Sequence, residues 1–319
     1  MVMASRKVDQ CRICGAGGLR TVLDLGDHAL TEFSKLPRAR RSIPQSSPLT
    51  LVQCPTCELV QLDHTVDPKI LYGGDFYPYK SGLSSTMRHH LEALAVETEQ
   101  AVIPAPDAVV VDIGCNDGTL LESFRAPWGA RVGFEPNQAL ALETTAKGFV
   151  VSNEMFSADG FRFLFPNGAK ASLITAIAMF YDVDGPLAFC RDVSEILHPD
   201  GLVVVQLNDL HSMLTNAAFD IIGHEHLTYW SLGALVHAWN SAGLQIYRVE
   251  HNALNGGSVR LWICHAGMRD ADRSVPDQLA LERKTLGPGA WQDFELRMQY
   301  VCHRLREFVT VTYAEKNIY

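Results

Sequence analysis

Two Cys-x-x-Cys pairs lie near the start of the chain, at residues 11–14 and 54–57. Four thiolates in two short-spaced pairs suit the tetrahedral preference of Zn²⁺ and leave no coordination position open for water or substrate. The pairs therefore predict a structural zinc site, with four unrelated buried thiols as the alternative. The predicted ligands are Cys11, Cys14, Cys54 and Cys57. Such a metal would stabilise an N-terminal segment that has too little apolar core to fold alone.

A predicted strand at residues 109–113, an apolar run with Asp112 near its end, leads into a glycine-rich turn, and residues 112–118 read Asp-Ile-Gly-Cys-Asn-Asp-Gly. The apolar run is typical of a parallel strand buried on both faces, and the glycines permit a tight turn into a helix. A second strand, residues 130–135, ends in Glu135. In doubly wound sheets an acid at this place accepts hydrogen bonds from ribose hydroxyls. These features predict a nucleoside-binding α/β domain.

The turn does not match the dinucleotide fingerprint G-x-G-x-x-G, because Asn116 and Thr119 stand where its second and third glycines would be. A pyrophosphate needs glycine where the backbone approaches it closely. The pattern therefore disfavours a nicotinamide dinucleotide. It suits a nucleoside without phosphates, such as S-adenosylmethionine.

A second concentration of reactive side chains lies at residues 223–231, Gly-His-Glu-His-Leu-Thr-Tyr-Trp-Ser. The zinc motif H-E-x-x-H does not apply, because its histidines need helical i, i+4 spacing. A general-base interpretation fits better, since a histidine can carry a proton near neutral pH and a neighbouring carboxylate can orient its ring. A hydrogen-bonded structural loop remains the alternative.

The elements that would position these residues alternate between strands and helices, as a doubly wound sheet requires. Asn255-Gly256-Gly257 joins the last two predicted strands in an antiparallel hairpin, the usual closing feature of class I methyltransferase sheets. The sequence thus predicts an α/β fold of that Rossmann-like class, preceded by a small zinc-binding domain. The predicted strands after the glycine turn are 171–176, 202–207, 244–249 and 259–264, and the predicted helices are 185–197, 231–243 and 291–306.

The segment before the glycine turn differs in character. Residues 72–82 form an aromatic and glycine-rich loop, which is either a packed linker or a lid over a ligand. A helix is predicted to begin near Ser84, and its apolar face is predicted from 3.6-residue periodicity. That face comprises Met87, Leu91, Leu94 and Val96.

The net charge, the apolar runs and the cysteines of the sequence each argue against certain classes of protein. The 319 residues carry a formal charge of −9, which argues against a nucleic-acid binder because phosphate neutralisation needs clustered Lys and Arg. No run approaches the ~20 apolar residues of a membrane span, and the N-terminus lacks a signal peptide. We therefore expect a cytoplasmic protein whose paired cysteines bind metal. The other cysteines are expected to be buried packing residues: Cys115, Cys190, Cys264 and Cys302.

In combination these motifs resemble the sugar C-methyltransferases, which methylate nucleotide-linked 4-ketosugars in deoxysugar and antibiotic biosynthesis. Members of that family carry a four-cysteine zinc domain, an S-adenosylmethionine domain with a turn like residues 112–118, the histidine-glutamate-histidine loop, and a hairpin like residues 255–258. The resemblance extends from about Cys11 to the helix near Arg306.

The resemblance implies roles for individual residues. In the family the second histidine of the loop acts as base and the glutamate assists, which implies His226 and Glu225, with His224 beside them. It implies structural Zn²⁺ and S-adenosylmethionine as the cofactors, and Tyr77 near the latter. The expected cofactor-binding residues are Tyr79, Ser81, Asp112, Gly114, Asn116, Asp117, Glu135, Pro136, Glu154, Phe156 and Ala176.

Two features depart from the family. Gly223 stands where relatives have a catalytic tyrosine, so a catalytic hydroxyl would come from Tyr77, Tyr79 or Tyr229, or be dispensable. Relatives continue for about a hundred residues beyond the position of Tyr319, in a C-terminal α/β domain that helps to enclose the substrate. The substrate site is then remodelled, completed by another subunit, or built for a different molecule.

We expect a zinc-binding domain at 1–69, an aromatic loop and linker helix at 70–100, a methyltransferase domain at 101–270 and a helical tail at 271–319. The expected partner is a small-molecule substrate, with no nucleic acid or membrane, and homo-oligomer formation is left open. Carbon methylation with His226 as base is the leading hypothesis. Methylation of oxygen or of another natural-product scaffold, and a cofactor-binding accessory protein without catalysis, are the alternatives.

Overall fold

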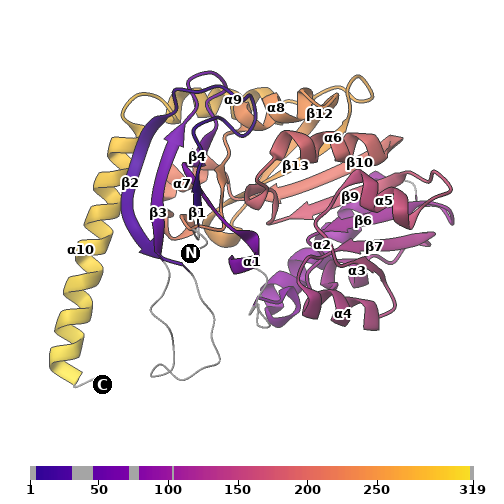
Figure 1. The fold of residues 1–319 in the computed structure, drawn as a ribbon, viewed down its shortest axis with the longest axis horizontal. Helices are drawn as coiled ribbons and strands as arrows, with labels where there is room; N and C mark the ends of the chain where they lie inside the picture. The colour runs from indigo at the N-terminus through magenta and orange to yellow at the C-terminus, as the bar shows by residue number, and fades with distance from the viewer. Residues whose placement is uncertain (1–4, 31–45, 72–78, 103, 317–319) are drawn as a thin grey trace.

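The computed structural model describes residues 5–30, 46–71, 79–102 and 104–316. Figure 1 shows a small N-terminal sheet beside a larger sheet that is flanked by helices, with one long helix, α10, at the outer edge. The predicted fold class is confirmed: the larger sheet is mostly parallel and follows the doubly wound plan of class I methyltransferases.

The larger sheet has the strand order β12-β13-β10-β9-β6-β7-β8. β10, β9, β6, β7 and β8 pair in parallel, whereas β13 pairs antiparallel with both β10 and β12. The predicted closing hairpin is therefore present. The strands are β6 Val109–Ile113, β7 Ala130–Phe134, β8 Val150–Ser152, β9 Ala171–Ile177, β10 Leu197–Leu207, β12 Leu244–Asn252 and β13 Ser258–His265.

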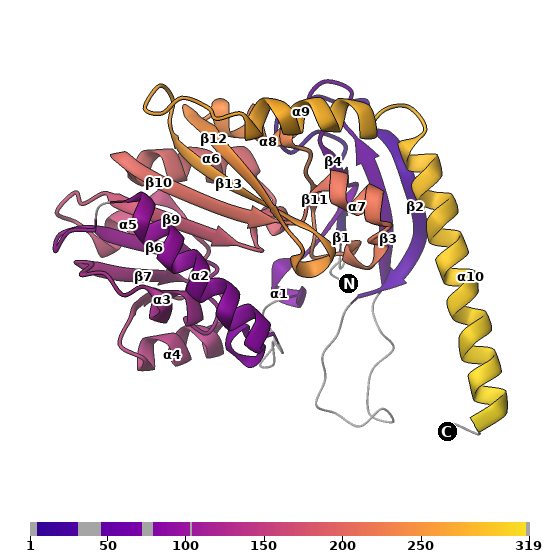
Figure 2. The ribbon, with the colours of Figure 1, turned by 180° about the vertical axis from the view of Figure 1, so that it is seen from behind.

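Helices cover both faces of this sheet, because alternate residues of each buried strand point to opposite sides. Val109 and Val111 pack with α5, α6 and α8, which lie on the near face in Figure 1. Val110 packs with α2 and α3 on the other face, where Figure 2 shows α2 crossing the strands. These helices are α2 Ser85–Ala101, α3 Thr119–Ser123, α4 Gln138–Ala146, α5 Ala158–Leu164, α6 Pro186–Ile196 and α8 Leu232–Asn240.

The smaller sheet has the order β11-β4-β3-β2, and one of its strands comes from the histidine loop. β11 pairs antiparallel with β4, so the loop at residues 223–231 is fixed to the N-terminal region. This pairing was not predicted. The remaining elements of this region are β1 Ser5–Lys7, β2 Arg20–Ala29, β3 Ser46–Gln53, β4 Val60–Leu62, β5 His64–Val66, α1 Pro68–Leu71, α7 Leu210–Asn216 and β11 Thr228–Tyr229.

The chain ends in α9 Ser274–Thr285 and α10 Ala290–Lys316, so the predicted helix at 291–306 is present and longer. The first half of α10 packs its fully buried Phe294 against the small sheet, and the second half projects away from the body in both ribbon views. Within the described residues, no helix has the length and apolar character needed to cross a membrane.

Two expectations about burial were wrong. Val96 is half exposed, because α2 buries Leu91, Leu94, Ala95 and Thr98, a stripe with i, i+3, i+4, i+7 spacing from which position 96 points away. Cys302 lies on the projecting half of α10 and is only partly buried, whereas Cys115, Cys190 and Cys264 are buried as predicted.

Candidate functional site

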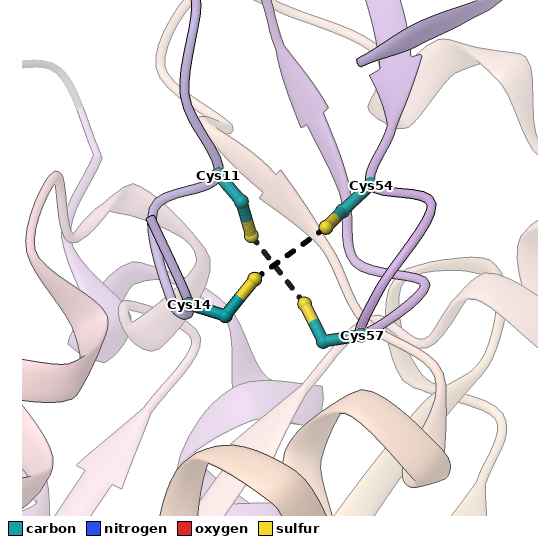
Figure 3. Close-up of side chains that lie close together, drawn as sticks. All are labelled: Cys11, Cys14, Cys54 and Cys57. Atoms are coloured by element: carbon teal, nitrogen blue, oxygen red, sulfur yellow. Dashed lines mark hydrogen bonds between the residues drawn. The ribbon is translucent and has the colours of Figure 1, made fainter. Parts of the chain in front are cut away.

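Cys11, Cys14, Cys54 and Cys57 converge on one point (Figure 3). Their sulfur atoms all lie within 4.8 Å of one another, with 3.4 Å between those of Cys11 and Cys57 and 3.5 Å between those of Cys14 and Cys54. A tetrahedral Zn²⁺ with bonds of about 2.3 Å separates its sulfur ligands by about 3.8 Å. The cluster therefore fits a four-thiolate zinc ion.

The backbone around each Cys-x-x-Cys pair forms the same kind of turn. Gly15 donates its N–H to the Cys11 carbonyl over 2.9 Å, and Glu58 donates to the Cys54 carbonyl over 3.1 Å. Both Gly15 and Glu58 have positive φ, of 72° and 61°. Each turn directs two sulfurs to the same side, so the local backbone prepares the metal site.

The protonation of the thiols also favours a cation. A hydrogen bond from Cys57 lowers the pKa of Cys11 to about 5, and the same contact raises the pKa of Cys57. The opposite shifts arise because a second thiolate would lie beside the first and repel it. A divalent cation removes this repulsion and allows both to ionise.

A cavity of about 410 Å³ lies at the carboxyl ends of β6, β7, β9 and β10, where doubly wound folds bind their ligands. Most of the expected cofactor-binding residues line it: Tyr79, Ser81, Asp112, Gly114, Asn116, Glu135, Pro136 and Phe156. The other expected residues lie elsewhere. Asp117 is buried below the turn, Glu154 is exposed, and Ala176 is buried within β9.

The floor of the cavity is the turn after β6. Gly114 adopts φ 71°, which favours glycine, and a Cβ there would come within 3.2 Å of the Met179 side chain, a tight contact. Asp112 accepts a hydrogen bond from the Thr175 hydroxyl over 2.7 Å. The pKa of Asp112 is raised to about 7, mainly by burial and also by the nearby Glu135, whereas the hydrogen bond from Thr175 opposes this shift. Within the described part of the chain, no cation forms an ion pair with this buried acid.

Glu135 is fixed at the end of β7 by two backbone donors. The N–H groups of Asn116 and Asn137 reach its carboxylate oxygens over 2.9 and 2.8 Å. Each oxygen keeps a second lone pair, so two vicinal hydroxyls could still donate to this carboxylate. Burial raises the pKa of Glu135, and the two backbone donors oppose this effect. The geometry suits the ribose of a nucleoside.

Asn116 and Asp117 use their side chains to hold the segment before α2. The Asn116 amide bonds the backbone of Tyr79 and Ser81 over 3.2 and 3.0 Å. Asp117 accepts from the Gly82 N–H over 2.9 Å. Residues 79–82 thereby form one wall of the cavity. Tyr77 and most of the predicted aromatic loop, residues 72–78, lie outside the described part of the chain.

In the histidine loop, His226 has a defined tautomer. Its Nδ1 lies 2.6 Å from the Ile221 carbonyl oxygen, which can only accept, so Nδ1 carries the proton and Nε2 keeps its lone pair. Burial lowers the pKa of His226, with an opposing effect from that carbonyl. The ring packs against that of Tyr181 at a centroid distance of 4.2 Å. His226 is therefore a neutral base at pH 7, although it lines a separate cavity of about 10 Å³ and not the main one.

The other members of the loop have different surroundings. His224 is buried against the small sheet, where its Nε2 donates to the Ser47 carbonyl over 3.0 Å, which is a structural contact. Burial raises the pKa of Glu225. The charge of the Glu225 carboxylate in turn raises the pKa of Asp182. Asp182 lines the main cavity and was missed by the sequence analysis.

The structure also defines the surroundings of Gly223. Its N–H donates to the Tyr229 hydroxyl over 3.4 Å, and a Cβ at Gly223 would meet nothing within 4 Å. Of the two candidate tyrosines that the structure describes, Tyr79 and Tyr229, it is Tyr229 whose hydroxyl lies beside Gly223. Tyr79 instead lines the cofactor side of the cavity.

Comparisons with known proteins agree with this arrangement. Residues 11–72 match the family described as "Putative zinc binding domain", and residues 85–249, just over half of the chain, match the family described as "Methyltransferase domain". The chain belongs to the methyltransferase domain family. This methyltransferase is 27% identical over 313 residues to C-methyltransferase NovU from Streptomyces niveus, an alignment that covers 97% of the chain and 74% of the relative.

Two further similarities are more limited. The methyltransferase is 26% identical over 144 residues to a ubiquinone biosynthesis O-methyltransferase from Parvibaculum lavamentivorans, covering 44% of the chain and 54% of the relative. The crystal structure of the YcgJ protein from Bacillus subtilis superposes with a TM-score of 0.43 and 12% identity, covering 55% of the chain and 97% of that structure.

The protein is an S-adenosylmethionine-dependent methyltransferase with an N-terminal zinc-binding domain. The residues present fit both groups. The four sulfurs match a zinc ion, and Asp112, Gly114 and Glu135 form an acid-lined turn that suits a cationic nucleoside without phosphates.

Proposed function

We propose that this methyltransferase methylates a carbon next to a ketone, most simply in a nucleotide-linked 4-ketosugar of deoxysugar or other natural-product biosynthesis. The observation that carries the proposal is the state of His226, a buried neutral imidazole whose Nδ1–H is held by the Ile221 carbonyl. Such a ring is suited to remove a proton from a weakly acidic carbon. The similarity to C-methyltransferase NovU over 97% of the chain supports the same reaction.

The protein's own residues would prepare both reactants. His226 takes the proton from the substrate carbon, and Glu225 stabilises the resulting imidazolium. Bound S-adenosylmethionine supplies an electrophilic methyl group. With the cofactor bound, Glu135 would hold the ribose and Asp112 would pair with the amino group, while residues 79–81 line the same cavity. Holding the carbon and the methyl in line accounts for much of the rate enhancement.

The test replaces the base without changing the cofactor pocket. His226→Asn should keep affinity for S-adenosylhomocysteine and lose roughly two to four orders of magnitude in turnover, the usual contribution of a general base. Glu225→Gln should lose less, because its role is to orient and stabilise the ring. Turnover is measured by mass spectrometry with a panel of ketosugar nucleotides and polyketide intermediates.

Solvent exchange provides a second readout. Deuterium should enter the substrate carbon in the wild-type protein without the methyl donor, and His226→Asn should abolish this exchange. A fully active His226→Asn would overturn the mechanism. The product would then be expected to carry the methyl on oxygen, the alternative that the match to an O-methyltransferase over 44% of the chain favours.

A further inference from the structure

A short helical turn lies between the main cavity and the histidine loop. This turn, η3 Phe180–Asp182, follows β9, and its backbone is held by the Thr228 hydroxyl, which donates to the Tyr181 carbonyl over 3.1 Å. Asp182, which follows β9, lines the cavity together with Gln206 of β10 and Ser258 of β13. In the strand order these three strands lie on one side of β6, and β7, which ends at Glu135, lies on the other. The side of these three strands is where an acceptor would lie if the nucleoside binds at Glu135.

The Oδ1 atom of Asp182 is buried and has no hydrogen-bond partner among the described residues. Buried polar atoms in proteins are nearly always paired, so an unpaired one beside a cavity points to a ligand. The contrast with Asp184 is informative, because that carboxylate two residues later accepts from Arg6, Arg12 and Thr65.

We propose that Asp182 is a catalytic residue whose protonated carboxyl group donates a hydrogen bond to the carbonyl oxygen of the methyl acceptor. This inference rests on the proposed carbon methylation and adds to it the group that stabilises the enolate. A donor aimed at the oxygen where charge develops is among the largest single contributions to such reactions.

The charges around Asp182 explain why it keeps its proton. The carboxyl group of Asp182 interacts electrostatically with Glu225 from the histidine loop and with Tyr229 from β11, and neither of these residues is a cation. Burial raises the pKa of Asp182 well above its usual range, and Glu225 raises it further. A neutral carboxylic acid can donate where a carboxylate could only accept.

The step balances with the residues named. His226 removes the proton from the substrate carbon, and the C–H electron pair becomes the carbon–carbon double bond of the enolate. The carbonyl π pair moves to the oxygen, which accepts the hydrogen bond from Asp182. The enolate carbon then bonds to the methyl group, the carbon–sulfur pair leaves with sulfur, and the ketone re-forms. Asp182 keeps its proton throughout.

Two substitutions at position 182 distinguish a donor from a base. Asp182→Asn retains an N–H donor and should keep turnover within about fivefold of wild type, whereas Asp182→Ala should lose about 100- to 1,000-fold, the usual effect of removing one such donor. Asp200→Asn, in an exposed position at the other end of β10, is the matched control and should be unchanged. Calorimetry with S-adenosylhomocysteine checks that each variant is folded.

Equal losses in Asp182→Asn and Asp182→Ala would overturn the donor role, as would full activity in Asp182→Ala. Infrared spectroscopy gives an answer that does not depend on an acceptor. Asp112, with a pKa of about 7, also absorbs as a protonated carboxyl at pH 7, so the readout is a difference spectrum. The protonated-carboxyl absorption of the wild-type protein should decrease in Asp182→Asn, and an unchanged absorption would also overturn the proposal. If the wild-type protein methylated carbon in no ketosugar nucleotide, the proposed function would fail while the infrared result stood on its own.

Discussion

At the scale of single residues, the cavity is defined by buried acids. Asp112, Glu135 and Asp182 all line it, and burial is the main cause of the raised pKa of each. Keeping carboxyl groups away from water and from cations costs folding free energy. The cost is offset when a cationic ligand binds. S-Adenosylmethionine carries a sulfonium and an ammonium group, so its charge complements this lining.

Asp112 should make cofactor affinity depend on pH. Its pKa is raised to about 7 in the free protein, and an ammonium group beside it favours the ionised form. Binding should therefore release a proton, and the dissociation constant for S-adenosylmethionine should fall as pH rises from 6 to about 8. Calorimetry in buffers of different ionisation enthalpy measures the released proton directly. Asp112→Asn should bind more weakly and without this pH dependence, and a pH-independent wild type would contradict the assignment.

The same group has an opposite effect on the stability of the free protein. A carboxyl whose pKa is higher in the folded than in the unfolded state stabilises most below its unfolded pKa of 3.8, and this contribution is lost as pH rises through about 7. Asp112→Asn without cofactor should therefore unfold at higher temperature than wild type at pH 8. At pH 4 the difference should largely vanish. A destabilised variant at pH 8 would show that Asp112 is ionised at little cost.

Glu135 should contribute to affinity through the ribose. Glu135→Ala removes a charge-assisted contact and should weaken S-adenosylhomocysteine binding by about 1.5–3 kcal/mol. Because the carboxylate also accepts from the backbone of Asn116 and Asn137, Glu135→Gln is the better matched change and should lose less. Unchanged affinity in both variants would mean that the ribose lies elsewhere.

At the scale of elements, the sequence predicted what local patterns determine. The strand at Val109–Ile113 was predicted with its exact bounds, because a run of four apolar residues and Asp112 ended by a glycine turn leaves little choice. The β11 strand was missed, since two residues, Thr228 and Tyr229, give no periodicity and their partners Gln61 and Val60 are distant in the chain. Asp182 was missed for the same reason, because its unpaired state depends on residues brought near by folding.

The turn after β6 was predicted to bind the cofactor with Asn116 and Asp117, yet these side chains hold residues 79–82 in the structure. Residue spacing in the sequence alone could not distinguish a side chain that contacts the cofactor from one that positions residues 79–82 beside it. Asn116→Ala should therefore increase amide hydrogen exchange in residues 79–83 as well as weaken cofactor binding. If it weakened binding with no change in exchange, Asn116 would act on the cofactor directly. Thr145→Ala, on the far side of α4, is a suitable control.

At the scale of the whole molecule, the zinc cluster and the reaction site belong to one packed unit. Cys11, Cys54 and Leu59 lie in the same apolar cluster as Phe180 and Trp230, which flank the proposed catalytic residues. The predicted domain boundaries after residues 69, 100 and 270 remain a prediction. Contacts between the N-terminal region and the rest of the chain cross these boundaries. One such contact is the pairing of β11 with β4.

A chain of hydrogen bonds connects the metal site to the histidine loop. The Arg12 N–H, inside the first Cys-x-x-Cys pair, donates to the Gln61 side chain over 2.9 Å. Gln61 pairs in register with Thr228, whose hydroxyl holds the Tyr181 carbonyl one residue before Asp182. Loss of the metal should therefore disturb both Asp182 and His226, although zinc takes no part in the chemistry.

Removal of zinc should consequently destabilise the protein as a single unit. Cys54→Ser breaks the ligand set, and a loss on the order of 3 kcal/mol would lower the melting temperature by roughly 6–12 °C. Calorimetry should record one transition, because the apolar cluster spans the two parts. Cys302→Ser, at a partly buried thiol on α10, is the matched control and should melt like wild type with one zinc per chain. The contrary result would be two separate transitions in Cys54→Ser, with the upper one unchanged from wild type. It would mean that the methyltransferase sheet folds independently of the metal. The contacts from Arg12 through Gln61 and Thr228 to Tyr181 would then not stabilise the Asp182 turn.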